Sequence, residues 1–185
     1  SEVEWSRSLA DLGLGSAPEV YAQLASAYTE TARYYHNSQH IAASLRLFNA
    51  HQANANHADE IRMAIWFHDA VYDTHATDNE ESSAAWATRF LQSQAASREV
   101  VQRISNMILA TKSHAANSSD EALLIDIDLS ILGTSQESFA AYDAAIRKEY
   151  SWVPEKDYRV GRAALLRTFL ERDAIYQTND FRQKY

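Results

Sequence analysis

Apolar side chains recur every three or four residues along most of the chain, which is the spacing of an amphipathic helix. The pattern predicts helices over residues 18–28, 38–52, 121–132 and 157–172, and further helices that begin near residues 59, 79, 98 and 135. Ser16 and Glu19 have the spacing of a capping box, and Asn37, Ser97 and Ser135 stand where helix N-caps are expected.

The scarcity of turn-forming residues supports the same fold class. The chain has 4 Gly and 2 Pro among 185 residues, whereas sandwiches, barrels and Rossmann-type folds use glycine at many of their turns. Gly133 is expected to end the helix over 121–132, and Pro154 to separate the last two helices. With 46% hydrophobic residues the chain has enough apolar surface for a core. We expect an all-α, compact single domain over 1–185.

Charge and composition narrow the function. Seventeen basic and 25 acidic residues give a net charge of −8, which argues against coating nucleic acid or docking on an anionic membrane. The absence of Cys excludes disulfides, thiolate catalysis and Cys-ligated zinc. The sequence has neither an apolar run of about 18 residues nor an N-terminal signal core, so we expect a cytoplasmic protein. A small phosphorylated substrate remains compatible with this charge.

The pair His68-Asp69 is ionisable but lies where helix periodicity demands a buried face. Burying a charge without a partner costs several kcal/mol, so the pair is either matched by other ions or holds a metal. In the alternative without a metal, His68 would hydrogen-bond a carbonyl and Asp69 would pair with an arginine.

His36 and His40 have the i, i+4 spacing of many metal ligands. If Asn37 caps the helix, however, His36 lies outside it and the two rings do not share a face. His40, followed by the apolar Ile41, is therefore the better candidate ligand. For either residue, a solvated histidine at a helix N-terminus is the alternative.

Asp126 and Asp128 alternate with Ile and Leu in a segment that is apolar almost all round. Such a helix is buried, so at least one of the two carboxylates needs a partner. Residues two apart lie on roughly opposite sides of a helix, so one metal is not expected to bind both.

The order His, His-Asp, Asp is the metal signature of the HD superfamily of phosphohydrolases, and the likeness extends further. The following segments resemble, in this order, those of one branch of that superfamily: YYHNSQH, AIWFHDAVYD, NEESSA, ATKSH, DIDLSILG, AAIRKEY and YRVGRAALLRTFL. The resemblance covers about residues 20–180 and implies an HD-type helical bundle. It also implies that His40, His68, Asp69 and Asp128 bind a metal, with Asp126 as the reserve ligand.

A set of two histidines and two carboxylates suits Mn, Fe, Co, Ni or Zn better than Mg. Phosphoryl transfer also needs cations, for which Lys112 and His114 are the first candidates and Arg33 the second. Asp73 or Glu80 could position or deprotonate the attacking water. Glu80 could instead only favour its helix N-terminus, and Lys112 could simply be solvated.

We do not expect the remaining polar residues to take part directly in the chemistry. His51, His57 and His75 stand in polar surroundings and are expected at the surface. Arg147 is expected to pair with a carboxylate. Tyr150, Tyr158 and Arg162 also match the family, with substrate contact as a minor possibility.

The sequence thus favours a metal-dependent phosphohydrolase that acts on a nucleotide or other small phosphorylated metabolite. One alternative is a non-catalytic HD-type module that binds a ligand and keeps the metal pocket. Another is a structural helical domain in which the His and Asp residues form an ion-pair network.

Overall fold

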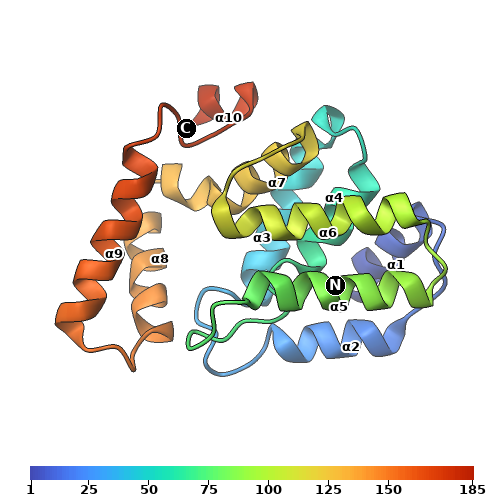
Figure 1. Cartoon of the computed structure of the whole chain (residues 1–185), viewed down its shortest axis with the longest axis horizontal. Coiled ribbons are helices and arrows are strands. Elements are labelled where there is room, and N and C mark those ends of the chain that lie inside the picture. Colours follow the sequence, from blue (N-terminus) through green and yellow to red (C-terminus); the bar gives the residue numbers. More distant parts are fainter.

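A computed structural model describes all 185 residues and contains ten α-helices, two short 3-10 helices and no strand (Figure 1). The elements, in chain order, are α1 (Glu2–Asp11), α2 (Pro18–Ala27), α3 (Ser38–His51), η1 (Gln52–Asn54), α4 (Ala58–Phe67), α5 (Asn79–Ser93), α6 (Arg98–Ser113), α7 (Ser119–Asp128), η2 (Leu129–Gly133), α8 (Gln136–Glu149), α9 (Glu155–Leu170) and α10 (Asn179–Lys184). The all-α class is therefore confirmed. None of the helices combines the length and apolar character that crossing a membrane requires.

Helix α4 lies at the centre of the hydrophobic core. Every side chain from Glu60 to Phe67 is buried, and helices α1, α3, α5, α6 and α7 all contact it. The two charged residues in this stretch have partners, because Glu60 accepts two hydrogen bonds from Arg103 and Arg62 donates to Asp11. The helix that leads into the candidate site is therefore held firmly by tight packing.

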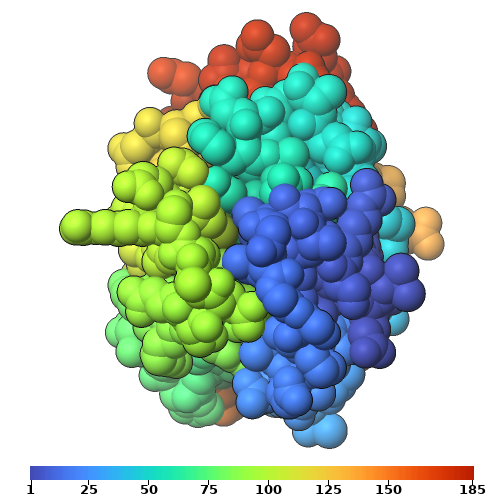
Figure 2. Space-filling model, turned by 90° about the vertical axis from the view of Figure 1, so that its right-hand side faces the viewer, coloured from blue at the N-terminus to red at the C-terminus, as the bar shows by residue number.

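Several of the other helices pack around α4. Helices α5 and α6 pack side by side, and α1 and α2 cover a neighbouring side of the molecule, where Figure 2 shows the N-terminal residues beside those of α6. Helices α8 and α9 form a hairpin that stands apart from this body at the opposite end of the molecule (Figure 1). The space between the hairpin and the body contains the candidate site.

Several local predictions are confirmed. The side chains of Asn37, Ser97 and Ser135 accept hydrogen bonds from backbone N–H groups in the first turns of α3, α6 and α8. Pro154 is the N-cap residue of α9 and separates that helix from α8.

Other local predictions are wrong. The N-cap of α2 is Ala17, not Ser16, and it makes no side-chain cap. Helix α7 ends at Asp128, and the chain continues to Gly133 as a 3-10 helix without a left-handed residue there. Gly133 instead permits close packing, since a Cβ at this position would lie 2.6 Å from the Tyr176 hydroxyl. The short helices α1 and α10 were not expected.

Candidate metal centre

The helix ends bring four side chains to one point. His40 lies in the first turn of α3, His68 is the C-cap of α4 with Asp69 next to it, and Asp128 is the last residue of α7. One ligand atom from each of the four residues lies within 4.8 Å of the other three. These are the four ligands that the resemblance implied.

The separations fit a shared cation. Two atoms that are each about 2.1 Å from one metal lie about 3.0–3.4 Å apart at angles of about 90–110°. His40 Nε2 is 3.1 Å from His68 Nε2 and 3.3 Å from both Asp69 Oδ2 and Asp128 Oδ1. His68 Nε2 is 3.1 Å from Asp69 Oδ2 and 3.7 Å from Asp128 Oδ1.

Hydrogen bonding supports the same interpretation. Asp69 Oδ2 is buried and accepts no hydrogen bond of acceptable geometry, although both imidazoles are close to it. His68 Nδ1 lies 2.9 Å from the carbonyl oxygen of Ile65, which can only accept, so the Nδ1 carries the proton. In the neutral ring the Nε2 lone pair then faces the centre. The donor set and the unpartnered oxygen both fit a divalent metal ion.

The charges of the four groups reinforce one another. Burial raises the pKa of Asp69, but the neighbouring charge of His68 outweighs burial and holds the pKa well below its usual range. Burial lowers the pKa of His68, but the charge of Asp69 more than compensates and raises it well above the ordinary value. Without a metal, these opposite charges can therefore stabilise each other as an ion-pair network.

Asp126 takes no part in this cluster. Its side chain is fully buried and accepts hydrogen bonds from the backbone N–H groups of Gln177 and Thr178, at 2.8 and 2.7 Å, and from the Thr178 hydroxyl. Asp126 thus attaches the segment that leads into α10, while Asp128 joins the histidines. The expectation that one metal would not contact both carboxylates agrees with this arrangement.

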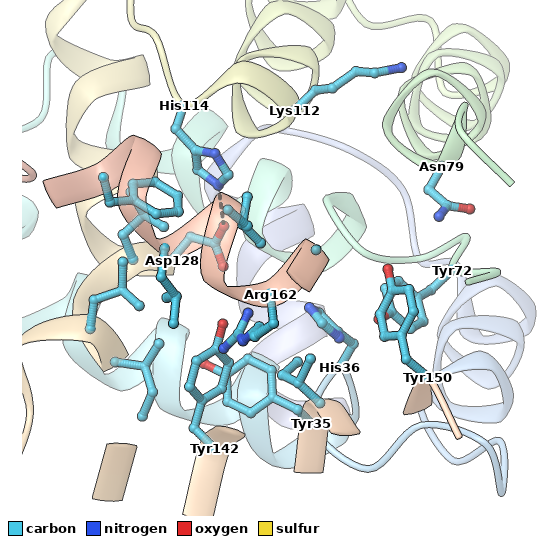
Figure 3. A pocket seen from close by; sticks show the side chains of 18 of the residues that line it. Tyr35, His36, Tyr72, Asn79, Lys112, His114, Asp128, Tyr142, Tyr150 and Arg162 are labelled. Carbon is cyan, nitrogen blue, oxygen red and sulfur yellow. Dashed lines mark ion pairs between the residues drawn. The ribbon is translucent and has the colours of Figure 1, made fainter. Parts of the chain in front are cut away.

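A cavity of about 560 Å³ opens beside the cluster, which is within the size range of small-molecule sites (Figure 3). Asp128 and His114 lie on its inner side, η2 contributes Leu129 and Leu132, and α8 and α9 form the facing wall. A second hollow of about 320 Å³ reaches His40 and Asp128 from another side. The cluster is therefore accessible to a ligand despite the burial of its histidines.

Three of the five proposed catalytic residues line the cavity. His114 Nε2 is 3.8 Å from Asp128 Oδ2, and burial lowers the pKa of this imidazole. Lys112 Nζ donates to the carbonyl of Thr77 and to Glu81. Glu80 lies in the first turn of α5 and also faces the cavity, so its two proposed roles are compatible.

The other two lie elsewhere. Arg33 is buried beneath the cluster, where it donates to the backbone carbonyls of Asp69 and Ala70 at 2.6 and 3.0 Å. It thus holds the chain that carries the ligand Asp69 and does not face the cavity. Asp73 is 62% exposed and accepts a hydrogen bond from the backbone N–H of His75 in a surface turn. These positions do not suit a phosphate clamp or a base.

The remaining histidines divide between surface and interior. His57 and His75 are exposed, as expected, but His51 is largely buried against Asp180 and Phe181 of α10. His36 precedes α3 and its Nδ1 lies 2.8 Å from Glu149, so it does not share a helix face with His40. Arg147 pairs with Glu155, as expected.

Glu149 is the main site residue that sequence reasoning missed. Its buried carboxylate accepts hydrogen bonds from the backbone N–H groups of Tyr35 and His36 and from the Tyr72 hydroxyl. The same carboxylate lies 2.8 Å from Nδ1 of the His36 ring. It thereby ties the end of α8 to the loops around the cluster. Its position three residues after the buried Ile146 was the available signal, since that spacing falls on the inward helix face.

Comparison with protein-family models, with curated proteins and with solved structures finds no match to this chain.

Proposed function

We propose that the chain is a metal-dependent phosphohydrolase of the HD type that acts on a nucleotide or another small phosphorylated metabolite. One observation carries the proposal: His40, His68, Asp69 and Asp128 converge beside a cavity of small-molecule size. The resemblance in sequence adds the reaction class, because a cluster of this kind alone could also serve a structural purpose.

The donor set indicates which ions to test. Two imidazoles and two carboxylates favour Mn, Fe, Co, Ni or Zn over Mg. A divalent ion held there would supply a water of lowered pKa and polarise a phosphate oxygen. His68, fixed through Nδ1 by the Ile65 carbonyl, and Asp69, fixed through its backbone by Arg33, would present their donor atoms without rearrangement.

Other residues of the cavity would complete the reaction. His114 faces Asp128 with a lowered pKa, and its neutral imidazole can exchange a proton with substrate or water near the cluster. Glu80 also lines the cavity, and its carboxylate could orient a water. The aromatic side chains of Tyr35, Tyr72 and Tyr150 form part of the same wall.

A test of hydrolysis uses the purified chain loaded with Mn, Co or Ni and a panel of nucleotides and sugar phosphates. We expect phosphate release that is lost in Asp69→Ala. Asp73→Ala is the matched control, because this exposed carboxylate lies four residues away and contacts only the surface turn. Absence of release from the wild type, or equal release from Asp69→Ala, contradicts the proposal.

Removal of the metal should lower stability. Occupancy of a site at a free metal concentration of about 100 times the Kd adds roughly 2.7 kcal/mol to the free energy of unfolding. We therefore expect a chelator to lower the melting temperature of the wild type and to leave that of Asp69→Ala unchanged. A melting temperature that does not respond in the wild type favours the structural ion-pair network instead.

One observation favours the ligand-binding alternative. The cations expected to clamp a phosphate are already engaged, Lys112 with Glu81 and Thr77, and Arg33 with backbone carbonyls. A pocket with a metal and without turnover would show ligand binding by calorimetry and no product. The same panel of phosphorylated compounds therefore distinguishes the two functions.

A further inference from the structure

Two buried polar groups on helix α9 have no partner within the protein. They are the hydroxyl of Tyr158 and the Nη2 of Arg162, and the only other such side-chain atom is Asp69 Oδ2 of the candidate metal cluster. Buried donors left unpaired are costly and rare in folded proteins. Their presence beside a cavity indicates that something outside the chain completes their hydrogen bonding.

The two groups share one face of the helix. Residues 158 and 162 are one helical turn apart, and both side chains line the cavity. Gly161 lies between them and also faces the cavity, where an added Cβ would meet no atom within 4 Å. The helix therefore carries two unpaired buried donors at the wall of the cavity, with open space at Gly161 between them.

The guanidinium of Arg162 is held in a defined position. Its Nε donates a hydrogen bond to Asp143 Oδ1 at 2.8 Å, and its Cζ lies 4.9 Å from the centre of the Tyr142 ring. The side chain is 9% exposed. Figure 3 shows Arg162 between Asp128 and Tyr142, and its side chain lines the cavity.

The other cations near the cavity already have partners within the protein. Arg33 donates to three carbonyls and to Glu30, Arg147 to Glu155 and to two carbonyls, and Arg172 to the carbonyls of Ser113 and His114. Lys112 is bound to Glu81 and Thr77. Arg162 is thus the cation of this region with a buried donor left to offer.

We propose that Tyr158 and Arg162 form the oxyanion-binding site of the cavity and bind a phosphate group of the ligand at the α9 wall. A guanidinium offers planar, permanently charged donors that match phosphate oxygens, and a phenol adds a further donor. Gly161 leaves room for the bulk of the bound group. The proposal rests on the proposed function for the identity of the anion, but its binding groups stand on α9 and not on the metal ligands.

Tyr158→Phe is the most informative variant. Because the hydroxyl has no partner in the protein, its removal should leave the melting temperature unchanged or raise it. Binding of inorganic phosphate to the full chain, measured by calorimetry at low ionic strength, should weaken about 10-fold. A fall in melting temperature with unchanged phosphate binding would assign the hydroxyl a structural role and overturn the proposal.

Arg162→Gln should weaken phosphate binding about 30-fold or more, since it removes the charge as well as the donors. Arg159→Gln is the matched control on the same helix, because Arg159 is exposed and does not line the cavity. Asp143→Asn removes the negative charge beside Arg162 but keeps an acceptor for its Nε, so phosphate should bind at least as tightly as in the wild type. Equal binding by the wild type and Arg162→Gln overturns the assignment, as does tighter binding of acetate than of phosphate.

Phosphate binding measured in the presence of a chelator distinguishes this site from the metal site. Phosphate binding by the wild type that persists in chelator and falls in Arg162→Gln supports the α9 site, whereas binding abolished by chelator alone places the anion on the metal and overturns it. Hydrolysis by the same proteins keeps the two proposals distinct. Substrate turnover together with unchanged phosphate binding in Arg162→Gln leaves the phosphohydrolase proposal standing and removes this one. Phosphate binding that depends on Arg162 without any turnover supports this proposal and contradicts the phosphohydrolase proposal.

Discussion

The central helices and the α8–α9 hairpin meet at the same cavity but are stabilised in different ways. Helix α4 buries every side chain from Glu60 to Phe67, whereas α9 buries only Phe169 among its 16 residues. The candidate metal ligands thus stand on closely packed backbone, and the facing wall is held by a few polar contacts, chiefly those of Glu149 and Arg172. Packing therefore fixes the geometry of the metal-ligand side of the site, whereas the α8–α9 side can adjust more easily to a ligand.

The largest expected effect comes from the ligands on the packed side. Asp128→Asn should lower metal affinity more than about 100-fold, because even loss of an outer-shell partner costs about 10–100-fold. Asp126→Asn is the matched control, two residues away on the same helix. It should bind metal nearly as the wild type but lose roughly 1–3 kcal/mol of stability through Gln177 and Thr178. Titration with Ni or Mn checks the order, and a larger metal defect in Asp126→Asn would contradict it.

The next effect addresses how the hairpin is attached. Glu149→Ala should lower the free energy of unfolding by roughly 3 kcal/mol, since it leaves buried donors of Tyr35, His36 and Tyr72 unpaired. Urea denaturation measures the change. Glu155→Ala provides the control, because its carboxylate is 65% exposed and pairs only with Arg147. A loss no larger than that of the control would mean that packing, and not this carboxylate, fixes the hairpin.

The same carboxylate predicts a dependence on pH. Burial raises the pKa of Glu149, but hydrogen bonds from His36 and from the backbone outweigh burial and bring the pKa to about 2, below its ordinary 4.5. A lowered pKa stabilises the fold fully above the ordinary value, and the contribution is lost as the pH falls towards about 2. The difference in unfolding free energy between wild type and Glu149→Gln should therefore shrink below about pH 4.5. A difference that is constant down to pH 3 or so contradicts this assignment.

The smallest effect tests whether the hairpin is optimised for stability. Gly161→Ala should raise the free energy of unfolding by about 0.5–1 kcal/mol, because glycine is a poor residue in a helix interior and the new methyl group meets no atom. Chemical denaturation measures the gain. A decrease in stability would show that the space beside Gly161 is already filled by the protein.

The sequence predicted the helices that local signals mark, in the packed region and in the hairpin alike, and missed two whose local signal is weak. Apolar spacing and the caps at Asn37, Ser97 and Ser135 located most helices, because these signals are local. Helix α1 was missed since only Trp5, Ser8 and Leu9 of its ten residues are buried, so its stripe is narrow. Helix α10 has six residues and depends on the burial of Phe181, a tertiary contact that no local pattern reveals.

The candidate site shows the same division. His40, His68, Asp69 and Asp128 could be named before the fold was known, because the resemblance in sequence marks them. The resemblance also favoured Asp128 over Asp126, and in the structure Asp128 meets the histidines while Asp126 binds the backbone of Gln177. The positions of Arg33 and Arg162 could not be foreseen, since each depends on backbone or helices distant in the chain. Periodicity locates a buried face but not the neighbour that covers it.

The left-handed backbone of His114 affects how its ring is positioned in the cavity. This C-cap residue of α6 adopts the left-handed conformation, with φ 51° and ψ 41°, which is unfavourable for a residue with a side chain. Arg172 and Gln177 both donate to its carbonyl and hold the backbone in place. The main chain therefore sets the direction of the Cα–Cβ bond, and the ring packs against Phe169 with 5.3 Å between the ring centres. The loss of rotational freedom that a flexible histidine would suffer on meeting a ligand has already occurred during folding, so the ring is preorganised.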